Sequence, residues 1–173
     1  MNILIVGCGR TGRRLVPALR ARGHQVAVLD RDAQALEELV QEGFDGPTIH
    51  GPAIDADALH QAGVESCGAV LAVTGQDEAN LIACQLAKKQ FEVPRTAARV
   101  NNPKNTASLK KLGADITMCS TEILTRLLER EVETSALRHV MSLSGGQADL
   151  TEVLLPTDFA LAGQTLTQAL IPP

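Results

Sequence analysis

Short apolar runs alternate along the chain with segments that carry apolar residues at helical spacing. The first run, Asn2–Val6, is nearly continuous and β-branched, which is typical of a strand buried on both faces. The segment that follows, Arg10–Arg22, carries a helical stripe that includes Val16 and Leu19. The chain therefore begins with a strand followed by a helix.

The same alternation continues as far as Cys119. Further strands are predicted at Gln25–Leu29, Thr48–His50, Ala69–Thr74, Thr96–Val100 and Ile116–Cys119. Helices are predicted between them at Ala33–Gln41, Asp55–Gln61, Asp77–Gln90 and Thr106–Leu112. Strands that alternate with helices form a parallel sheet with helices on both faces. We therefore predict an α/β fold, a Rossmann-like doubly wound six-stranded parallel sheet.

The pattern changes after the last of these strands. Ser120 or Thr121 caps a helix that is expected to run to about Leu137 with a broad apolar side. Gly145-Gly146 predicts a turn, and Leu150–Leu155 predicts a strand. The stretch that begins at this strand is too short to bury a core. We expect a crossover helix and then the beginning of a second small domain, truncated or completed by a dimer partner.

Composition restricts the classes of protein to consider. Aromatic residues are 2% of the chain and apolar residues 45%, so the core is aliphatic. The net charge of −4 and the absence of a basic run argue against nucleic acid as a partner. No apolar stretch reaches the ~20 residues that span a bilayer, so direct membrane insertion is not expected. The first residues lack the charged region of a signal peptide, which favours a cytoplasmic protein.

Four cysteines lie far apart, with no CxxC pair and no metal-binding spacing: Cys8, Cys67, Cys84 and Cys119. We interpret them as buried or neutral thiols in a reducing compartment.

The motif that carries chemistry is Gly7-Cys8-Gly9-Arg10-Thr11-Gly12, a GxGxxG placed directly after the first strand. Gly7 permits the tight turn, Gly9 lets the backbone approach a pyrophosphate, and Gly12 permits close helix–strand packing. The helix N-terminus presents free N–H groups and partial positive charge to phosphate. The position between a strand and a helix is the context that this motif requires.

Asp30 ends the second strand, 18 residues after Gly12. A carboxylate at this position accepts both ribose hydroxyls of an adenosine and disfavours a 2′-phosphate. The alternative role of Asp30 is a turn aspartate or helix N-cap. The neighbouring Arg31 either lies over the adenosine or is a solvated loop cation.

With these residues placed, the sequence resembles the RCK/KTN (TrkA N-terminal, NAD-binding) domain family, the regulatory domains of Trk and Ktr potassium-uptake systems and of potassium channels. The resemblance covers Met1 to about Glu133 and continues more loosely to the end. Beyond the glycine loop, it is carried by Val73-Thr74, Asp77-Glu78-Ala79-Asn80-Leu81, Ala97-Ala98-Arg99-Val100, Leu112-Gly113-Ala114-Asp115 and, near the end, Val153-Leu154-Leu155-Pro156 with Ala162-Gly163-Gln164-Thr165-Leu166. It implies an RCK_N domain over residues 1–133, a helix end and linker over 134–150, and a truncated RCK_C start over 151–173.

The resemblance also implies a ligand and an assembly. Such domains bind NAD(H) or an adenine nucleotide (ATP, ADP or AMP), pair as homodimers, and form rings beneath a membrane potassium transporter or channel subunit. The chain would then be a cytoplasmic regulatory subunit at the inner face of the membrane. By family match, the ligand-binding residues are Gly7, Gly9, Arg10, Thr11, Gly12, Asp30, Arg31, Ala53, Val73, Thr74, Asn80 and Arg99.

Three of the positions read from the resemblance have a second interpretation. Asn80 either approaches the distal phosphates or instead forms hydrogen bonds with the local backbone near the start of its helix. Arg99 points into the crevice at the carboxyl end of its strand or instead pairs with a carboxylate such as Asp77 or Glu78. Glu122 binds a divalent ion at a subunit interface or only complements the helix dipole.

The chain departs from the family pattern after its third strand. Family members commonly carry Gly-Asp-Ala or Gly-Asn-Ala there, and this chain has Gly51-Pro52-Ala53. Proline removes a hydrogen-bonding side chain and a backbone donor, so altered adenine recognition is expected.

The sequence favours a binding protein over an enzyme. Hydride transfer needs a substrate site and a proton donor or acceptor, and His24, His50, His60 and His139 form no constellation. The alternative hypothesis is a small NAD-dependent oxidoreductase or a fragment of one. A third possibility is a nucleotide sensor for another cation transporter.

Overall fold

The computed structural model describes residues 1–132, 137–143, 148–153, 155, 158–160 and 162–164. The chain forms two units, Met1–Thr125 and Arg126–Pro173. We describe each unit by itself.

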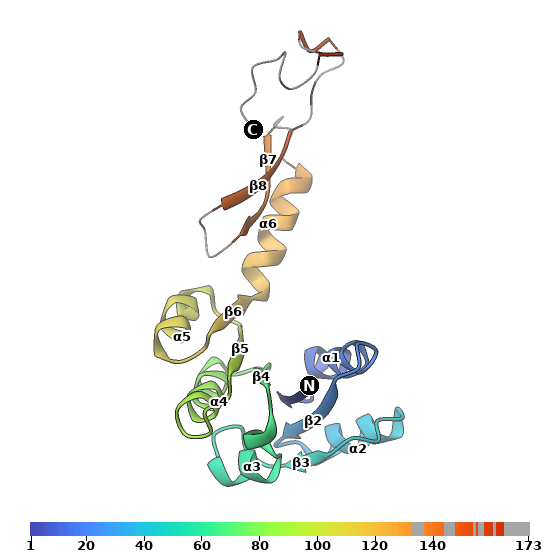
Figure 1. The fold of residues 1–173 in the computed structure, drawn as a ribbon, viewed down its shortest axis with the longest axis vertical. Helices are drawn as coiled ribbons and strands as arrows, with labels where there is room; N and C mark the ends of the chain where they lie inside the picture. Colours follow the sequence, from blue (N-terminus) through green and yellow to red (C-terminus); the bar gives the residue numbers. More distant parts are fainter. Residues whose placement is uncertain (133–136, 144–147, 154, 156–157, 161, 165–173) are drawn as a thin grey trace. The chain divides into compact units, whose positions relative to one another are not determined.

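Six parallel strands form the sheet of the first unit (Figure 1), in the order β3-β2-β1-β4-β5-β6. They are β1 (Asn2–Val6), β2 (Gln25–Asp30), β3 (Thr48–His50), β4 (Ala69–Ala72), β5 (Arg95–Val100) and β6 (Ile116–Cys119). The predicted Rossmann-like doubly wound sheet is confirmed. The strand order reverses direction between β1 and β4, and in open parallel sheets ligands bind at the carboxyl ends beside such a reversal.

The helices of this unit follow the strands in turn: α1 (Arg10–Arg20), α2 (Ala33–Gln41), α3 (Ala56–Gln61), α4 (Asp77–Lys89) and α5 (Thr106–Leu112), with 3-10 turns η1 (Val64–Ser66) and η2 (Pro103–Asn105). Side-chain caps start two of these α-helices. Asp32 accepts hydrogen bonds from the Gln34 and Ala35 amides at α2, and Asp55 accepts one from the Asp57 amide at α3. Asp55 is therefore the cap of α3, one residue before the helix begins.

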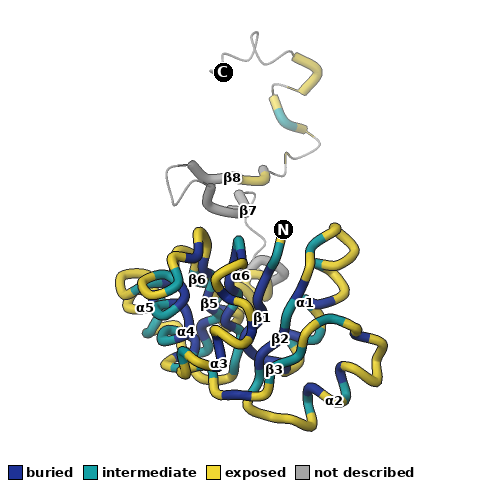
Figure 2. The backbone as a smooth tube through the Cα atoms, turned by 60° about the horizontal axis from the view of Figure 1, so that its bottom comes forward, coloured by how far each residue is buried: buried dark blue, intermediate teal, exposed yellow. Residues whose placement is uncertain are grey.

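The core lies on both faces of the sheet, because successive residues of a strand point to opposite sides. Leu4 and Val6 pack with residues of α3, α4 and α5, whereas Ile5 packs with Val16 of α1 and Leu36 of α2. Figure 2 shows the central strands β1 and β4 mostly in the colour of buried residues. The core of the unit is almost entirely aliphatic, as the composition predicts.

All four cysteines are buried and free, as the sequence analysis expects. Burial raises the pKa of Cys84 to about 12, with a further contribution from the charge of Asp115. The Cys84 thiol therefore stays protonated and unreactive at neutral pH.

A buried carboxylate joins α4 to the loop after β5. Asp77 is 6% exposed. Its oxygens accept hydrogen bonds from the Asn101 amide (2.7 Å), the Asn101 side chain (2.8 Å), the Asn102 amide (3.0 Å) and the Asn105 side chain (2.8 Å). Burial alone would raise the pKa of Asp77, but these four hydrogen bonds outweigh it and hold the pKa below its ordinary value.

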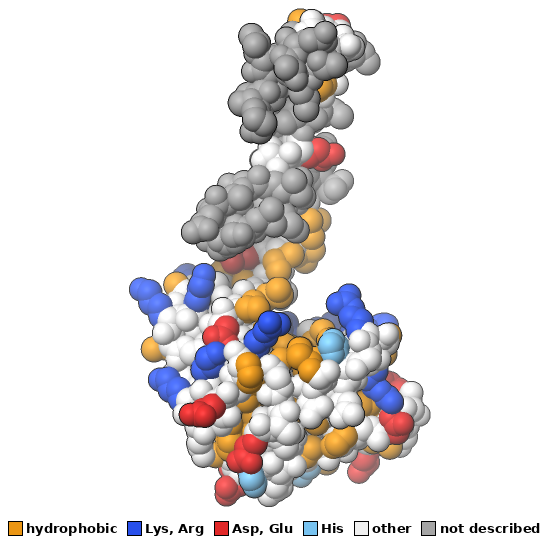
Figure 3. Space-filling model, in the orientation of Figure 1, with side chains coloured by type: hydrophobic (Ala, Val, Ile, Leu, Met, Phe, Trp, Pro, Cys, Tyr) orange, Lys and Arg blue, Asp and Glu red, His pale blue; other side chains and the backbone are white. Residues whose placement is uncertain are grey.

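The helix after the sheet is shorter than the sequence predicts. α6 covers Ser120–Val132, and Leu137 begins the strand β7 (Leu137–Leu143), so the expected helix end near Leu137 is wrong. The apolar pattern of α6 gave no stop signal, since no glycine or proline follows it before Gly145. The exposed large apolar residues include four of α6: Ile123, Leu124, Leu127 and Leu128. Figure 3 shows hydrophobic side chains at the surface of this helix.

In the second unit, β7 pairs with β8 (Ala148–Val153) in an antiparallel ladder that shifts register between His139 and Met141. The strand predicted at Leu150–Leu155 is confirmed with an earlier start and an earlier end, because β8 stops at Val153 and Leu155 is not in a strand. The predicted turn at Gly145-Gly146 lies outside the described residues. No helix in the described part of the chain has the length and hydropathy to cross a membrane.

We predict that Asp77→Asn lowers the free energy of unfolding by on the order of 1–3 kcal/mol, because an amide leaves at least one buried donor unpaired. Asp57→Asn, on the exposed first turn of α3, is the matched control and should change stability by less than about 0.5 kcal/mol. Urea unfolding at neutral pH measures both.

The pH dependence of this difference gives a second check. A carboxylate with a depressed folded-state pKa contributes its full stability above the unfolded pKa of about 3.9 and loses it as pH falls through the folded pKa. The stability gap between the wild type and Asp77→Asn should therefore narrow on acidification. A gap that stays constant down to acid unfolding contradicts this role of Asp77.

Candidate functional site

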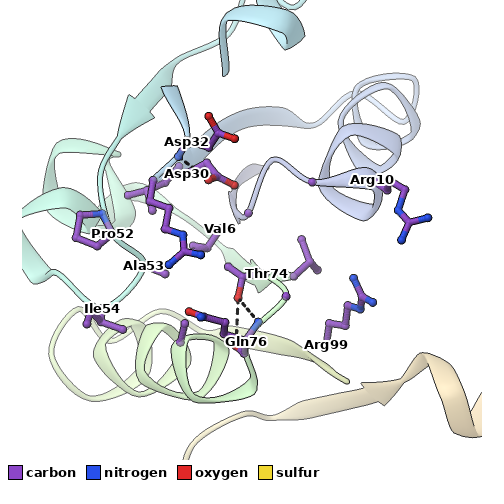
Figure 4. A pocket seen from close by; sticks show the side chains of 17 residues that line it. Val6, Arg10, Asp30, Asp32, Pro52, Ala53, Ile54, Thr74, Gln76 and Arg99 are labelled. Carbon is purple, nitrogen blue, oxygen red and sulfur yellow. Dashed lines mark hydrogen bonds between the residues drawn. The ribbon is translucent and has the colours of Figure 1, made fainter. Parts of the chain in front are cut away.

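A cleft of about 550 Å³ opens at the carboxyl ends of the central strands. Figure 4 shows residues from β1, β2 and β5, from the helices α1 and α4, and from the turns that follow strands, converging on it. Its lining is Val6, Gly7, Gly9, Arg10, Leu29, Asp30, Arg31, Asp32, Pro52, Ala53, Ile54, Val73, Thr74, Gly75, Gln76, Ala79 and Arg99.

The glycine loop shapes one side of the cleft. Gly7 has φ +114°, and a Cβ there would lie 2.9 Å from the Thr74 amide nitrogen. A Cβ at Gly12 would lie 1.8 Å from the Gly7 carbonyl oxygen, so only glycine allows α1 to pack this closely. By contrast, a Cβ at Gly9 would meet nothing within 4 Å. Gly9 therefore leaves open space at the cleft instead of relieving an internal clash.

The start of α1 keeps its backbone donors available. Gly9 is the N-cap and provides no side-chain hydrogen bond, and the first turn contains no acidic residue. The first amides of a helix have no partner within the helix and carry partial positive charge. This end of α1 is therefore suited to an anion.

Asp30 connects the loop to the second strand. Its carboxylate accepts hydrogen bonds from the Cys8 amide and, at 2.8 Å, from the Asp32 amide. The N-cap of helix α2 is Asp32. Asp30 therefore does not have the helix N-cap role that the sequence analysis considered for it. A carboxylate has about four acceptor positions, so Asp30 keeps acceptor capacity toward the cleft.

Three arginines line the cleft: Arg10, Arg31 and Arg99. The ion pairs found among the described residues involve none of them. Arg99 donates from Nη1 to the Thr11 hydroxyl at 3.3 Å, and its buried Nε has no partner in the described structure. The considered pairing of Arg99 with Asp77 does not occur, because Asp77 is engaged by the asparagines after β5.

Asn80 lies beneath the cleft and does not line it. It is fully buried, accepts hydrogen bonds from the Thr74 amide (2.9 Å) and hydroxyl (2.7 Å), and donates to the carbonyls of Thr74 (3.2 Å) and Arg99 (2.9 Å). Its side chain is thus fully occupied in joining the ends of β4 and β5. This is the local backbone role that the sequence analysis kept open for Asn80.

Most of the sequence-predicted residues therefore meet at one cleft. Gly7, Gly9, Arg10, Asp30, Arg31, Ala53, Val73, Thr74 and Arg99 line it, whereas Thr11, Gly12 and Asn80 do not. Sequence reasoning did not name the other lining residues: Val6, Leu29, Asp32, Pro52, Ile54, Gly75, Gln76 and Ala79. Their signal was their position, since all but Ala79 lie at or within four residues of the carboxyl end of a strand.

The remaining candidates lie elsewhere. Glu122 is in the first turn of α6, and no cluster of three or more metal-binding side chains occurs among the described residues. His24, His50 and His60 do not line the cleft. The side chain of His139, in β7, lies outside the described part of the structure.

A family model, the TrkA-N domain, matches residues 3–120. The chain belongs to the TrkA-N family. The matched segment contains the sheet, the glycine loop and every lining residue of the cleft.

Curated relatives of this TrkA-N chain carry the name Trk system potassium uptake protein TrkA. The protein from Streptomyces coelicolor is 38% identical over 137 residues, which cover 77% of this chain and 61% of the relative. The protein from Mycobacterium tuberculosis is 30% identical over 176 aligned residues, covering 99% of this chain and 78% of the relative. The chain thus spans about three fifths of the first relative and about four fifths of the second.

Solved structures agree with the fold. The GsuK channel bound to NAD is 27% identical with a TM-score of 0.71, over 83% of this chain and 26% of the channel chain. GsuK bound to ADP is 26% identical with a TM-score of 0.64, over 73% of this chain and 33% of that chain.

We predict that Gly12→Ala destabilises the TrkA-N domain and that Gly9→Ala does not. Gly12→Ala forces a methyl group against the Gly7 carbonyl and should destabilise the domain by about 1–3 kcal/mol or more. Gly9→Ala should leave the melting temperature of the ligand-free protein nearly unchanged, because its methyl group enters open space.

Thermal unfolding without ligand measures this contrast, and Gly75→Ala, whose Cβ also meets nothing within 4 Å, is a control for adding a methyl group elsewhere on the cleft. Equal losses of stability in the Gly9 and Gly12 variants would contradict the division of roles within the loop.

Proposed function

We propose that this chain is the cytoplasmic nucleotide-binding regulatory subunit of a potassium uptake system or channel. One observation carries the proposal. A glycine loop, a helix N-terminus without a side-chain cap and three arginines that form no ion pair with a described carboxylate surround one cleft, with the Asp30 carboxylate on the adjacent strand. Positive groups beside one positioned carboxylate suit a ligand that carries phosphate and a sugar with free hydroxyls.

The ligand we infer is NAD(H) or an adenine nucleotide, ATP, ADP or AMP. Its phosphates would lie at the start of α1 near Arg10, its ribose hydroxyls at Asp30, and its base against Ala53. Arg99 would approach the distal phosphates or the second half of a dinucleotide, because Arg10 and Arg99 lie at the same end of the cleft (Figure 4). The GsuK structures bound to NAD and ADP support this ligand class.

A hydrogen-bonded route for regulation leads from the cleft to α6. Thr74 lines the cleft, its carbonyl accepts from the Asn101 side chain at 3.4 Å, and the Asn101 carbonyl accepts from the Thr121 hydroxyl at 3.5 Å. Thr121 is in the first turn of α6. A ligand that contacts Thr74 differently in two assembly geometries would shift their populations.

We further propose that the chain assembles as a homodimer or a ring and acts on a membrane potassium transporter or channel subunit. The relatives named TrkA support the partner. Support for the assembly comes from four exposed apolar residues of α6: Ile123, Leu124, Leu127 and Leu128. Exposed apolar side chains that lie together often mark a protein–protein interface, because burying them against a partner is favourable. In this proposal residues 1–133 bind the nucleotide and residues 151–173 open an RCK_C domain.

The proposal assigns binding without chemistry to the cleft. The acidic groups on its lining are Asp30 and Asp32, and both accept backbone hydrogen bonds that hold the loop and α2 in place. As positioned hydrogen-bond acceptors, they are suited to fixing a ligand.

We predict that Asp30→Ala weakens ADP binding at least about tenfold, because a charge-assisted hydrogen bond to the ribose contributes roughly 1.5–3 kcal/mol. Isothermal titration calorimetry measures the change. Asp45→Ala is the matched control, because the Asp45 carboxylate pairs with Arg20 and does not line the cleft. Unchanged affinity in a folded Asp30→Ala protein would contradict the ribose assignment.

Arg99→Gln should weaken binding progressively more from AMP to ADP to ATP, because the guanidinium is placed for distal phosphates. Arg95→Gln, at the opposite end of the same strand, removes the same charge outside the cleft and should leave all three affinities unchanged. A loss with Arg99→Gln that is equal for the three nucleotides would contradict this position of the arginine.

A further inference from the structure

Arg99 is held at both of its ends. Its backbone carbonyl accepts a hydrogen bond from the buried Asn80 side chain at 2.9 Å, and its guanidinium donates from Nη1 to the Thr11 hydroxyl at 3.3 Å. Asn80 is itself fixed at the end of β4 by the Thr74 amide (2.9 Å) and hydroxyl (2.7 Å). The arginine that lines the cleft therefore runs between two anchors, one on α4 and one on α1.

The anchor on α1 joins parts of the fold that do not pair with each other in the sheet. Arg99 is the penultimate residue of β5, whereas Thr11 is the second residue of α1, which follows β1. Because β4 lies between β1 and β5, the Arg99 side chain reaches over the carboxyl end of β4 to meet Thr11. This contact holds the guanidinium beside the first turn of α1, where the phosphates would lie in the proposed function.

Thr11 contacts the arginine and does not line the cleft itself. The family resemblance implies that Thr11 binds the ligand. The geometry instead places the Thr11 hydroxyl as an acceptor behind a cation that does line the cleft. A residue in this position acts on a ligand through its neighbour.

The guanidinium of Arg99 keeps donors for an anion while it is bound to Thr11. A guanidinium carries N–H groups on Nε, Nη1 and Nη2. One N–H of Nη1 is donated to Thr11, and the N–H of Nε is buried without a partner in the described structure. The remaining donors on Nη1 and Nη2 are of the kind that binds phosphate oxygens in pairs, which requires a defined orientation of the guanidinium plane.

We propose that Thr11 is a positioning residue, whose hydroxyl holds the Arg99 guanidinium in the orientation that receives the distal phosphates of the nucleotide. This inference rests on the proposed function and adds to it the residue that orients Arg99. A long arginine side chain loses many rotamers when a ligand fixes it. A partner that orients the side chain before binding lowers this cost, so the ligand is bound more tightly.

Thr11→Val tests the role, because valine keeps the branched shape and removes the hydroxyl. We expect the dissociation constants for ADP and ATP in calorimetry to rise about three- to tenfold, the factor that corresponds to ordering one long side chain on binding. The affinity for AMP, which lacks distal phosphates, should change by less than about twofold. Thr11→Ser keeps the hydroxyl and should bind all three nucleotides like the wild type.

A matched control separates this effect from a general effect on the fold. Thr48→Val makes the same chemical change on strand β3, outside the cleft, and should leave the three affinities unchanged. Thermal unfolding without ligand confirms that each variant folds.

A double-mutant cycle shows whether Thr11 acts through Arg99. Arg99→Met removes the group that Thr11 positions, so Thr11→Val should cause no further loss of ADP or ATP affinity in the Arg99→Met background. An equal loss in both backgrounds would mean that Thr11 contacts the nucleotide directly, and it overturns the inference.

The other outcomes separate the inference from the function on which it rests. Unchanged or tighter ATP binding by the folded Thr11→Val protein, or a loss that is the same for AMP and ATP, overturns the positioning role and leaves the proposed function intact. Failure of AMP, ADP and ATP to bind the folded wild type overturns the proposed function itself.

Discussion

The close approach of α1 to the end of β1 is the constraint on which the rest of the site depends. A hydrogen atom at Gly12, in place of a side chain, lets the first turn of α1 lie against the Gly7 carbonyl, and the positive φ of Gly7 turns the chain beneath the Thr74 amide. This packing fixes where the free amides of α1 point. It also brings the Cys8 amide to the Asp30 carboxylate, so the loop and the second strand become one rigid surface. The binding geometry is thus built before any ligand arrives, which lowers the cost of ordering it.

Charged and apolar residues lie at different ends of the cleft. Arg10 and Arg99 lie at one end, the apolar residues Pro52 to Ile54 at the other, and Asp30 between them (Figure 4). A ligand with phosphate, sugar and an apolar-faced base matches this order only in one orientation. The arginines have no ion pairs with the described carboxylates, so a phosphate would not have to displace an existing partner.

Buried polar residues connect the cleft to the rest of the first unit. Asn80 joins the ends of β4 and β5, and Asp77 holds the asparagine-rich loop that follows β5. Both side chains form their hydrogen bonds within the fold, as buried polar groups in an aliphatic core normally do. Because Asn101 contacts both Thr74 and Thr121, the same polar layer reaches the start of α6. The TrkA-N fold therefore places its ligand cleft and its outgoing helix on one hydrogen-bonded network.

The sequence by itself determined the six strands, their parallel arrangement, the glycine loop and the position of Asp30, because hydrophobic periodicity and local turn chemistry depend on neighbours along the chain. Since parallel strands place their carboxyl ends at one edge, most of the lining residues also followed. The tertiary structure alone decided which polar group faces the cleft. Asp32 caps α2, Asn80 turns inward, Arg99 reaches Thr11, and α6 ends at Val132 instead of continuing to Leu137. Each of these outcomes except the helix end depends on contacts between residues distant in sequence or on competition for one hydrogen-bond partner, which periodicity does not encode. The sequence has no glycine or proline stop signal near the end of α6, so it did not predict where the helix ends. The structure shows that the chain is already in strand β7 at Leu137.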